Sequence, residues 1–147
     1  VVPISTYLSR YYININNYET ALELLENSYR ANQNDLITNE LLLKAYLFTN
    51  NNYSAYIKAK ELFSSYYNNE TYAEIYFTLA IDFNLIEEAL SSNVLIKSEN
   101  VVVHRIFFEK ILNRNILQNS VIKEYLKYSV EKFPKDEYLE SLLLTLD

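Results

Sequence analysis

Apolar residues recur at helical spacing along almost the whole chain. One stripe with the i, i+3, i+4, i+7, i+8, i+11 pattern consists of Tyr72, Ile75, Tyr76, Leu79, Ala80 and Phe83. Two further stripes near the C-terminus consist of Ile122, Tyr125, Leu126, Val130 and Phe133, and of Tyr138, Leu139, Leu142, Leu143 and Leu146. Residues at this spacing share one face of an α-helix, so each stripe predicts a helix with one buried face. No segment shows the alternation of a β-strand.

The full pattern predicts nine helices, over residues 3–14, 18–31, 36–49, 54–67, 70–83, 85–97, 101–113, 120–133 and 136–146. The connections are about five residues or shorter, so consecutive helices are expected to be antiparallel neighbours. Asn16 with Glu19, and Asn84 with Glu87, have the spacing of capping boxes. Asp35 suits the N-cap of the third helix, and Pro134 is expected to end the eighth.

The chain contains no glycine, which changes how its turns can be made. Asparagine stands instead between the predicted helices, in Asn14, Asn16 and Asn17, in Asn50–Asn52, and in Asn68 and Asn69. Asparagine tolerates the left-handed backbone conformation and also caps helices, so it can take both positions that glycine often fills. The absence of glycine also excludes glycine-rich phosphate-binding loops.

A bulky residue stands three positions before an alanine in three of the predicted helices. The pairs are Tyr18 with Ala21, Tyr56 with Ala59, and Ile86 with Ala89, and the alanines are 38 and 30 residues apart. Such recurrence predicts stacked helix pairs, with the alanines where neighbouring helices come close. We therefore expect one all-α domain over residues 1–147, an α-solenoid of about four antiparallel helix pairs and a C-terminal helix.

These positions resemble the tetratricopeptide repeat family, in a degenerate form. The first pair carries the resemblance best: Leu8 and Tyr12 stand in its first helix, and Tyr18, Ala21, Leu25 and Ser28 in its second. The intervals depart from the family's period of about 34 residues, and Ile122 replaces the alanine of the fourth pair. The resemblance implies a concave groove lined by the first helix of each pair. Its expected partner-binding residues are Thr6, Arg10, Glu40, Lys44, Phe48, Glu74 and Thr78.

Charge and candidate chemistry narrow the function classes. The net charge of −6 disfavours nucleic acid and anionic membranes as partners. Without cysteine, the single histidine, His104, cannot build a zinc site, and we interpret it as a structural or surface residue. The carboxylate pairs Glu87–Glu88 and Asp136–Glu137 lie in first helical turns, where the helix dipole favours them. We therefore expect no catalytic residues, no cofactor and no metal.

The first hypothesis is a non-catalytic scaffold that binds a peptide or helical segment of a protein partner in the groove. An accessory domain of a larger enzyme, such as a membrane glycosyltransferase or ligase, is the alternative, because the chain begins Val1-Val2-Pro3 without methionine and reads as a fragment. An RNA-binding repeat is disfavoured by charge. No apolar run approaches a membrane span, so we expect a soluble segment without direct membrane insertion. The apolar end at Leu142–Leu146 suggests self-association through the C-terminal helix.

Overall fold

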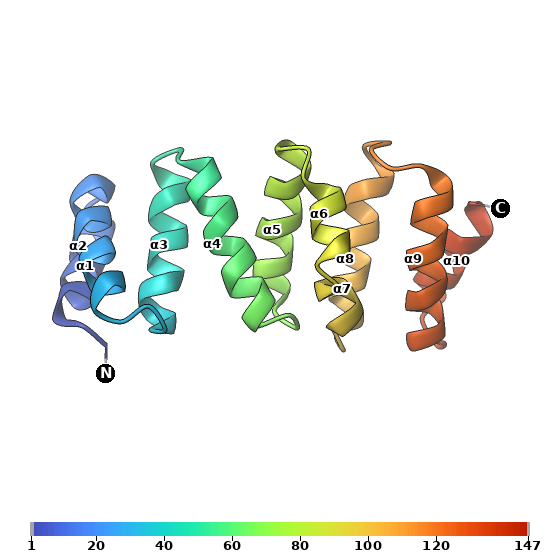
Figure 1. Ribbon diagram of the computed structural model, residues 1–147, viewed down its shortest axis with the longest axis horizontal. Coiled ribbons are helices and arrows are strands. Elements are labelled where there is room, and N and C mark those ends of the chain that lie inside the picture. Colours follow the sequence, from blue (N-terminus) through green and yellow to red (C-terminus); the bar gives the residue numbers. More distant parts are fainter. Residues whose placement is uncertain (1, 147) are drawn as a thin grey trace. The chain divides into compact units, whose positions relative to one another are not determined.

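The computed structural model describes residues 2–146 and contains ten helices and no strand within them (Figure 1). The helices are α1 (Ile4–Asn14), α2 (Tyr18–Ala31), α3 (Leu36–Phe48), α4 (Asn52–Ser65), α5 (Glu70–Asp82), α6 (Ile86–Ser91), α7 (Val94–Lys97), α8 (Val101–Leu112), α9 (Asn119–Lys132) and α10 (Glu137–Thr145). The all-α fold class is therefore confirmed. The chain divides into two compact units, Val1–Leu62 and Phe63–Asp147, and each is described by itself. The single domain expected from the sequence stays a prediction.

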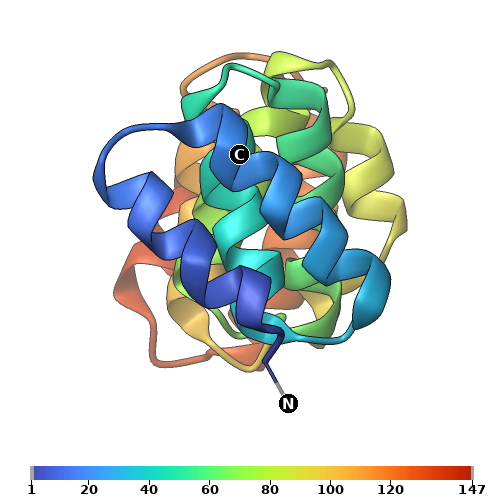
Figure 2. The ribbon, with the colours of Figure 1, turned by 90° about the vertical axis from the view of Figure 1, so that its left-hand side faces the viewer.

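In the first unit, successive helices pack side by side. α1 packs against α2 and α2 against α3, and Figure 2 looks onto α1 and α2 with α3 behind them. The core cluster of this unit is Ile13, Ala21, Leu25, Leu42 and Ala45, all almost fully buried. Partly buried large residues surround it, namely Tyr12, Tyr18, Leu22, Tyr29, Leu41 and Tyr46. The two alanines give the helices room to approach, and the large side chains fill the space beside them.

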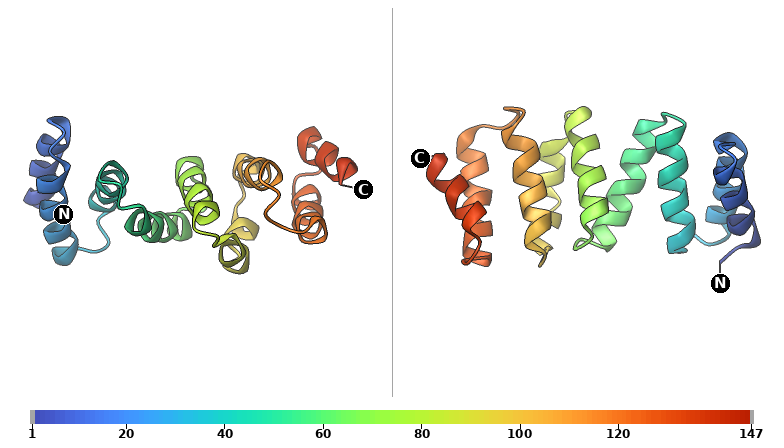
Figure 3. Two further views of the ribbon diagram at one scale, coloured as in Figure 1. Left: turned by 90° about the horizontal axis from the view of Figure 1, so that it is seen from above. Right: turned by 180° about the vertical axis from the view of Figure 1, so that it is seen from behind.

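The second unit is built around aromatic side chains. α5 packs against α6 and α8, α8 against α9, and α9 against α10, which lie side by side in Figure 3. Phe77 is central: its ring centroid is 5.4 Å from that of Phe63 and 5.1 Å from that of Phe107, both at steep interplanar angles. Edge-to-face contacts of this kind add to the free energy gained by burying the rings.

Asparagine makes the left-handed turns, as the glycine-free composition predicted. Five described residues have positive φ and all are asparagines, namely Asn16, Asn50, Asn84, Asn93 and Asn115. Three of them close the preceding helix in the same way: the amide of Asn50 donates to Leu47 O and the amide of the next residue, Asn51, to Tyr46 O. This pair of bonds is the Schellman motif. Equivalent bonds surround Asn16 and Asn84.

Both predicted capping boxes are therefore wrong by one residue. Asn16 ends α1, and the side chain of the following residue, Asn17, caps α2 by accepting from Thr20 N at 3.2 Å. Asn84 likewise ends α5, and Leu85, which has no side-chain acceptor, stands at the N-cap of α6. Asp35 caps α3 as expected.

The left-handed turns also show a regular interval that the alanine pattern missed. Asn16, Asn50 and Asn84 are 34 residues apart, and five residues after each stands a buried alanine: Ala21, Ala55 and Ala89. The sequence pattern instead paired Ala21 with Ala59, which lies one helical turn beyond Ala55 and is also buried.

One predicted helix is divided. Residues 85–97 were expected to form a single helix, but α6 and α7 are separated by Ser92 and Asn93. Asn93 has φ of 57°, which no continuous right-handed helix accommodates. The remaining predicted helices lie within a few residues of the observed bounds.

Candidate functional site

The expected groove residues of the first unit lie in different environments. The side chains of Arg10, Glu40, Lys44 and Phe48 are exposed. Thr6 is not at the surface: it is fully buried, and its hydroxyl lies 2.8 Å from that of Thr38. Thr6 is therefore a correction to the predicted groove, because a residue sealed between α1 and α3 cannot contact a partner.

Phe48 forms the centre of an aromatic surface at the end of α3. Its side chain is 55% exposed, although it is large and apolar. Its ring stacks on that of Tyr18, with centroids 4.6 Å apart and an interplanar angle of 2°. The Lys44 ammonium lies 6.0 Å from the Phe48 centroid, one helical turn earlier on α3. We call Tyr18, Lys44 and Phe48 the Phe48 surface.

An open hollow of about 540 Å³ adjoins this surface. It is lined by Ile15, Asn16, Asn17, Tyr18, Glu19, Phe48, Thr49 and Asn50. Two left-handed turns, at Asn16 and Asn50, thus form its walls. Since their backbone donors are used within the turns, the shape of the hollow is held by main-chain hydrogen bonds.

In the second unit, Glu74 and Thr78 are brought together on α5. The Thr78 hydroxyl donates to Glu74 O at 2.7 Å, and the Glu74 carboxylate forms an ion pair with Lys110 of α8. Both residues line a hollow of about 300 Å³ with Ile81, Ile106, Glu109, Lys110, Asn113 and Arg114. Arg114 pairs with Asp82 at 3.4 Å. Lys110 and Arg114, the two cations of this hollow, are therefore each paired with an acidic residue of α5.

The remaining residues of the predicted groove are divided between the two units. Arg10, Glu40, Lys44 and Phe48 belong to the first unit, and Glu74 and Thr78 to the second. A groove that runs across both units stays a prediction.

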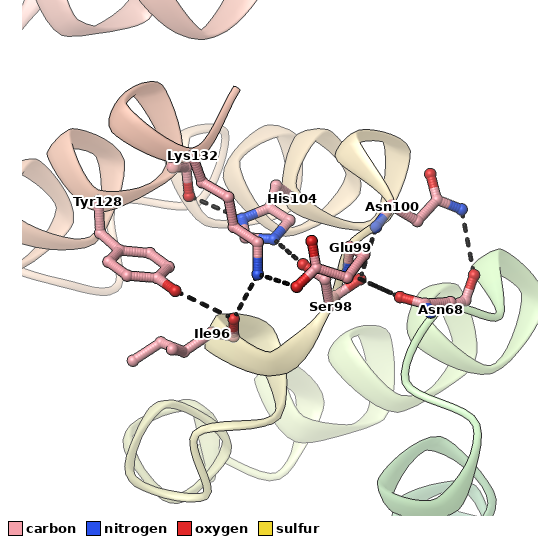
Figure 4. Close-up of polar contacts among 9 residues, drawn as sticks. Asn68, Ile96, Ser98, Glu99, Asn100, His104, Tyr128 and Lys132 are labelled. Atoms are coloured by element: carbon pink, nitrogen blue, oxygen red, sulfur yellow. Dashed lines mark hydrogen bonds and ion pairs between the residues drawn. The ribbon is translucent and has the colours of Figure 1, made fainter. Parts of the chain in front are cut away.

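His104 lies in a buried polar cluster of the second unit (Figure 4). Its Nε2 lies 3.0 Å from Ser98 O and its Nδ1 2.7 Å from Ser129 Oγ. A carbonyl oxygen only accepts, so Nε2–H donates to Ser98, and Ser129 donates to Nδ1 of the neutral ring. Burial lowers the pKa of His104, opposed by the bond to Ser98. The imidazole and both partners are buried, so of the two positions expected from the sequence, structural or surface, the surface position is excluded.

The loop before α8 is held from both sides around this histidine (Figure 4). Asn68 Oδ1 accepts from Ser98 Oγ at 3.2 Å and from Glu99 N at 2.8 Å. From α9, the Lys132 ammonium donates to Ile96 O and pairs with Glu99, both at 2.9 Å. These contacts join the loop through side chains to Asn68, between α4 and α5, and join both the loop and α7 to α9.

The carboxylate pairs have structural surroundings. Glu87 and Glu88 lie in the first turn of α6, as predicted. Asp136 is the N-cap of α10: its Oδ1 accepts from Leu139 N at 3.0 Å, and its Oδ2 accepts from Arg105. Burial raises the pKa of Asp136, but the hydrogen bonds from Arg105 and Leu139 outweigh burial and leave that pKa below its usual value.

Sequence reasoning missed the aromatic partner of Phe48. The sequence pattern identified Tyr18 only as the bulky residue three positions before Ala21, whereas in the structure its partly buried ring stacks on Phe48. The positions are 30 residues apart, and no local spacing could have joined them.

Among residues 2–146, no group of three or more His, Cys, Asp or Glu side chains could hold a metal ion. No helix in this range combines the length and apolar character needed to cross a bilayer. Comparison of the chain with protein-family models, with curated proteins and with solved structures gives no match.

Proposed function

We propose that this chain is a non-catalytic module that binds a segment of another protein at the Phe48 surface. The observation that carries the proposal is the exposure of Phe48. Phe48 is 55% exposed, and the contact of its apolar ring with water is unfavourable, so a partner that covers the ring gains binding free energy. Its stacking on Tyr18 holds the ring in one position, so little side-chain entropy is lost when a partner binds.

The surroundings of Phe48 indicate which residues a partner segment should carry. Aromatic residues are enriched at protein interfaces and often carry much of the binding free energy. Lys44 beside the ring favours a carboxylate next to an apolar anchor on the partner. The adjoining hollow is lined by Ile15, Tyr18 and Phe48 among mostly polar residues, and these three side chains can contact that anchor. A short helical or extended segment with one large apolar residue and a neighbouring Asp or Glu fits this arrangement.

The interval between the left-handed asparagines supports the resemblance to tetratricopeptide repeats. Asn16, Asn50 and Asn84 are 34 residues apart, which equals the repeat length of that family. Proteins built from such repeats bind protein segments through their helices, and the proposed role follows that analogy.

A photo-crosslinking experiment tests the proposal. The photoreactive residue benzoylphenylalanine replaces Phe48 in one variant and Tyr53 in the control, since Tyr53 is 59% exposed on α4. After irradiation in a lysate of the source cells, crosslinked segments are identified by mass spectrometry. We expect one recurrent segment with an apolar residue beside an acidic residue, at position 48 only.

The variant Lys44→Glu, Phe48→Ala provides the second arm. A synthetic peptide of the recovered segment should bind the parent chain and bind this variant at least about tenfold more weakly, since ring contacts and one charge are lost. The same crosslinks from positions 48 and 53, or equal affinity for the variant, would refute the assignment of the Phe48 surface.

A further inference from the structure

A stripe of large apolar side chains lies exposed on α1. Ile4, Tyr7, Leu8 and Tyr11 follow the i, i+3, i+4, i+7 spacing of one helix face. Their exposed fractions lie between 47% and 86%. We call these four residues the α1 stripe. A stripe of this kind is ordinarily buried, so its exposure requires an explanation.

The 34-residue interval shows which residues of α3 correspond to the α1 stripe. Ile4, Tyr7, Leu8 and Tyr11 correspond to Thr38, Leu41, Leu42 and Ala45, since Asn16 and Asn50 end the two helices in the same turn. In α3 these positions face inward. Thr38, Leu42 and Ala45 are almost fully buried, and Leu41 is partly buried.

The same unit also shows what covers this face in α3. α2 packs against α3, and Leu42 and Ala45 share a cluster with Ala21 and Leu25 of α2. Leu22 and Tyr29 of α2 flank this cluster. This face of α3 therefore accepts a helix with large apolar residues around one alanine. α1 lies in front of α3 in Figure 2, with its own outer side toward the viewer.

We infer that the α1 stripe is a docking surface for an amphipathic helix of a partner protein, which packs on α1 as α2 packs on α3. The stripe has only large side chains, so the partner helix needs a small residue opposite them, as Ala21 is in α2. Arg10 is the only charged residue of α1, and its guanidinium lies 5.9 Å from the Tyr7 ring centroid. An acidic residue beside the partner's apolar stripe complements it. This surface is separate from the Phe48 surface, and the inference does not depend on the proposed function.

A peptide with the sequence of α2 is the probe. Residues 17–32 are synthesised with a fluorophore and with a hydrocarbon staple at positions 19 and 23, which are exposed in α2 and therefore away from the contact. The staple is needed because a helix of this length is marginal alone in water. Binding to the whole chain is followed by fluorescence anisotropy.

We expect saturable binding that weakens about tenfold or more in Leu8→Glu, and similarly when the peptide carries Leu25→Glu. Leu8 is 47% exposed, so Leu8→Glu should keep the fold, and a thermal melt of this variant beside the parent separates a loss of binding from a loss of folding. Lys44→Glu, Phe48→Ala is the matched control and should bind the peptide unchanged, whatever its effect on the proposed function.

Three results would overturn the inference. They are no binding at about 100 μM of the chain, equal binding by parent and Leu8→Glu, and a parent dimer in analytical ultracentrifugation that Leu8→Glu converts to monomer. The third result would make a second copy of the chain the occupant of the α1 stripe.

Discussion

Replacing Asn50 tests whether the left-handed turns depend on backbone conformation. Asn50 has φ of 56° and is followed by an amide that donates to Tyr46 O at 2.9 Å. A residue with a Cβ costs roughly 1–2 kcal/mol in this conformation, asparagine tolerates it better, and glycine has no such cost. The main-chain amides of residues 50 and 51 remain in every variant. A substitution at position 50 should therefore change stability mainly through the cost of placing the new residue at positive φ.

We expect Asn50→Ala to lower the free energy of unfolding by about 1 kcal/mol, and Asn50→Gly to stay within about 0.5 kcal/mol of the parent. For a chain of this size, about 1 kcal/mol corresponds to a Tm lower by about 2–4 °C. The turns at Asn16 and Asn84 are separate sites, so the triple alanine variant should lose about 3 kcal/mol and the triple glycine variant little.

Urea unfolding followed by circular dichroism at 222 nm gives these differences, provided that the m-value stays constant. Asn14→Ala is the control, because Asn14 is exposed and belongs to the right-handed helix α1; it should be neutral or slightly stabilising. Equal destabilisation by alanine and glycine at position 50 would show that the asparagine side chain, and not φ, holds the turn. The reasoning would then be refuted.

Three further predictions concern single side chains. Ala21→Leu should lower the free energy of unfolding by about 1–3 kcal/mol, because Ala21 is fully buried in the core cluster of the first unit; a thermal melt equal to the parent's would contradict the packing. Asp136→Ala should lower the free energy of unfolding by about 1 kcal/mol through the lost α10 cap. Because the pKa of Asp136 is lowered in the folded chain, the stability that its carboxylate contributes is present above its usual pKa and is lost as pH falls through the lowered value. The pKa of His104 is also lowered, so the folded chain should lose stability as pH falls below about 6.5; His104→Gln should flatten that part of the profile, and an unchanged profile would argue against the buried neutral ring.

The helices could be predicted from the sequence because their signals are local. Apolar spacing, Asp35 before α3 and Pro134 after α9 each act within one or two turns. The doubled asparagine at Asn16-Asn17 misled the first capping prediction for a physical reason. In Asn16-Asn17 the first residue closes one helix and the second caps the next, and both conformations suit asparagine equally.

The candidate site could be predicted only in part. The exposure of Lys44 and Phe48 follows from their place on the outer face of α3. The burial of Thr6 does not follow, because a small polar residue suits either solvent or a hydrogen-bonded seam, and the deciding partner, Thr38, is 32 residues away. The same limit hid the stacking of Tyr18 on Phe48 and the pairing of Lys110 with Glu74. Contacts between distant residues have no local signature.

The asparagine turns also bear on the chemical ageing of the chain. Deamidation begins when the main-chain nitrogen of the following residue attacks the asparagine side-chain carbonyl and forms a succinimide. At Asn16, Asn50 and Asn84 that nitrogen donates a hydrogen bond into the preceding helix, at 2.8, 2.9 and 2.7 Å. The next residue is also larger than glycine in each case. The hydrogen bonds that close each helix thus withhold the nucleophile, and these asparagines should persist through long storage.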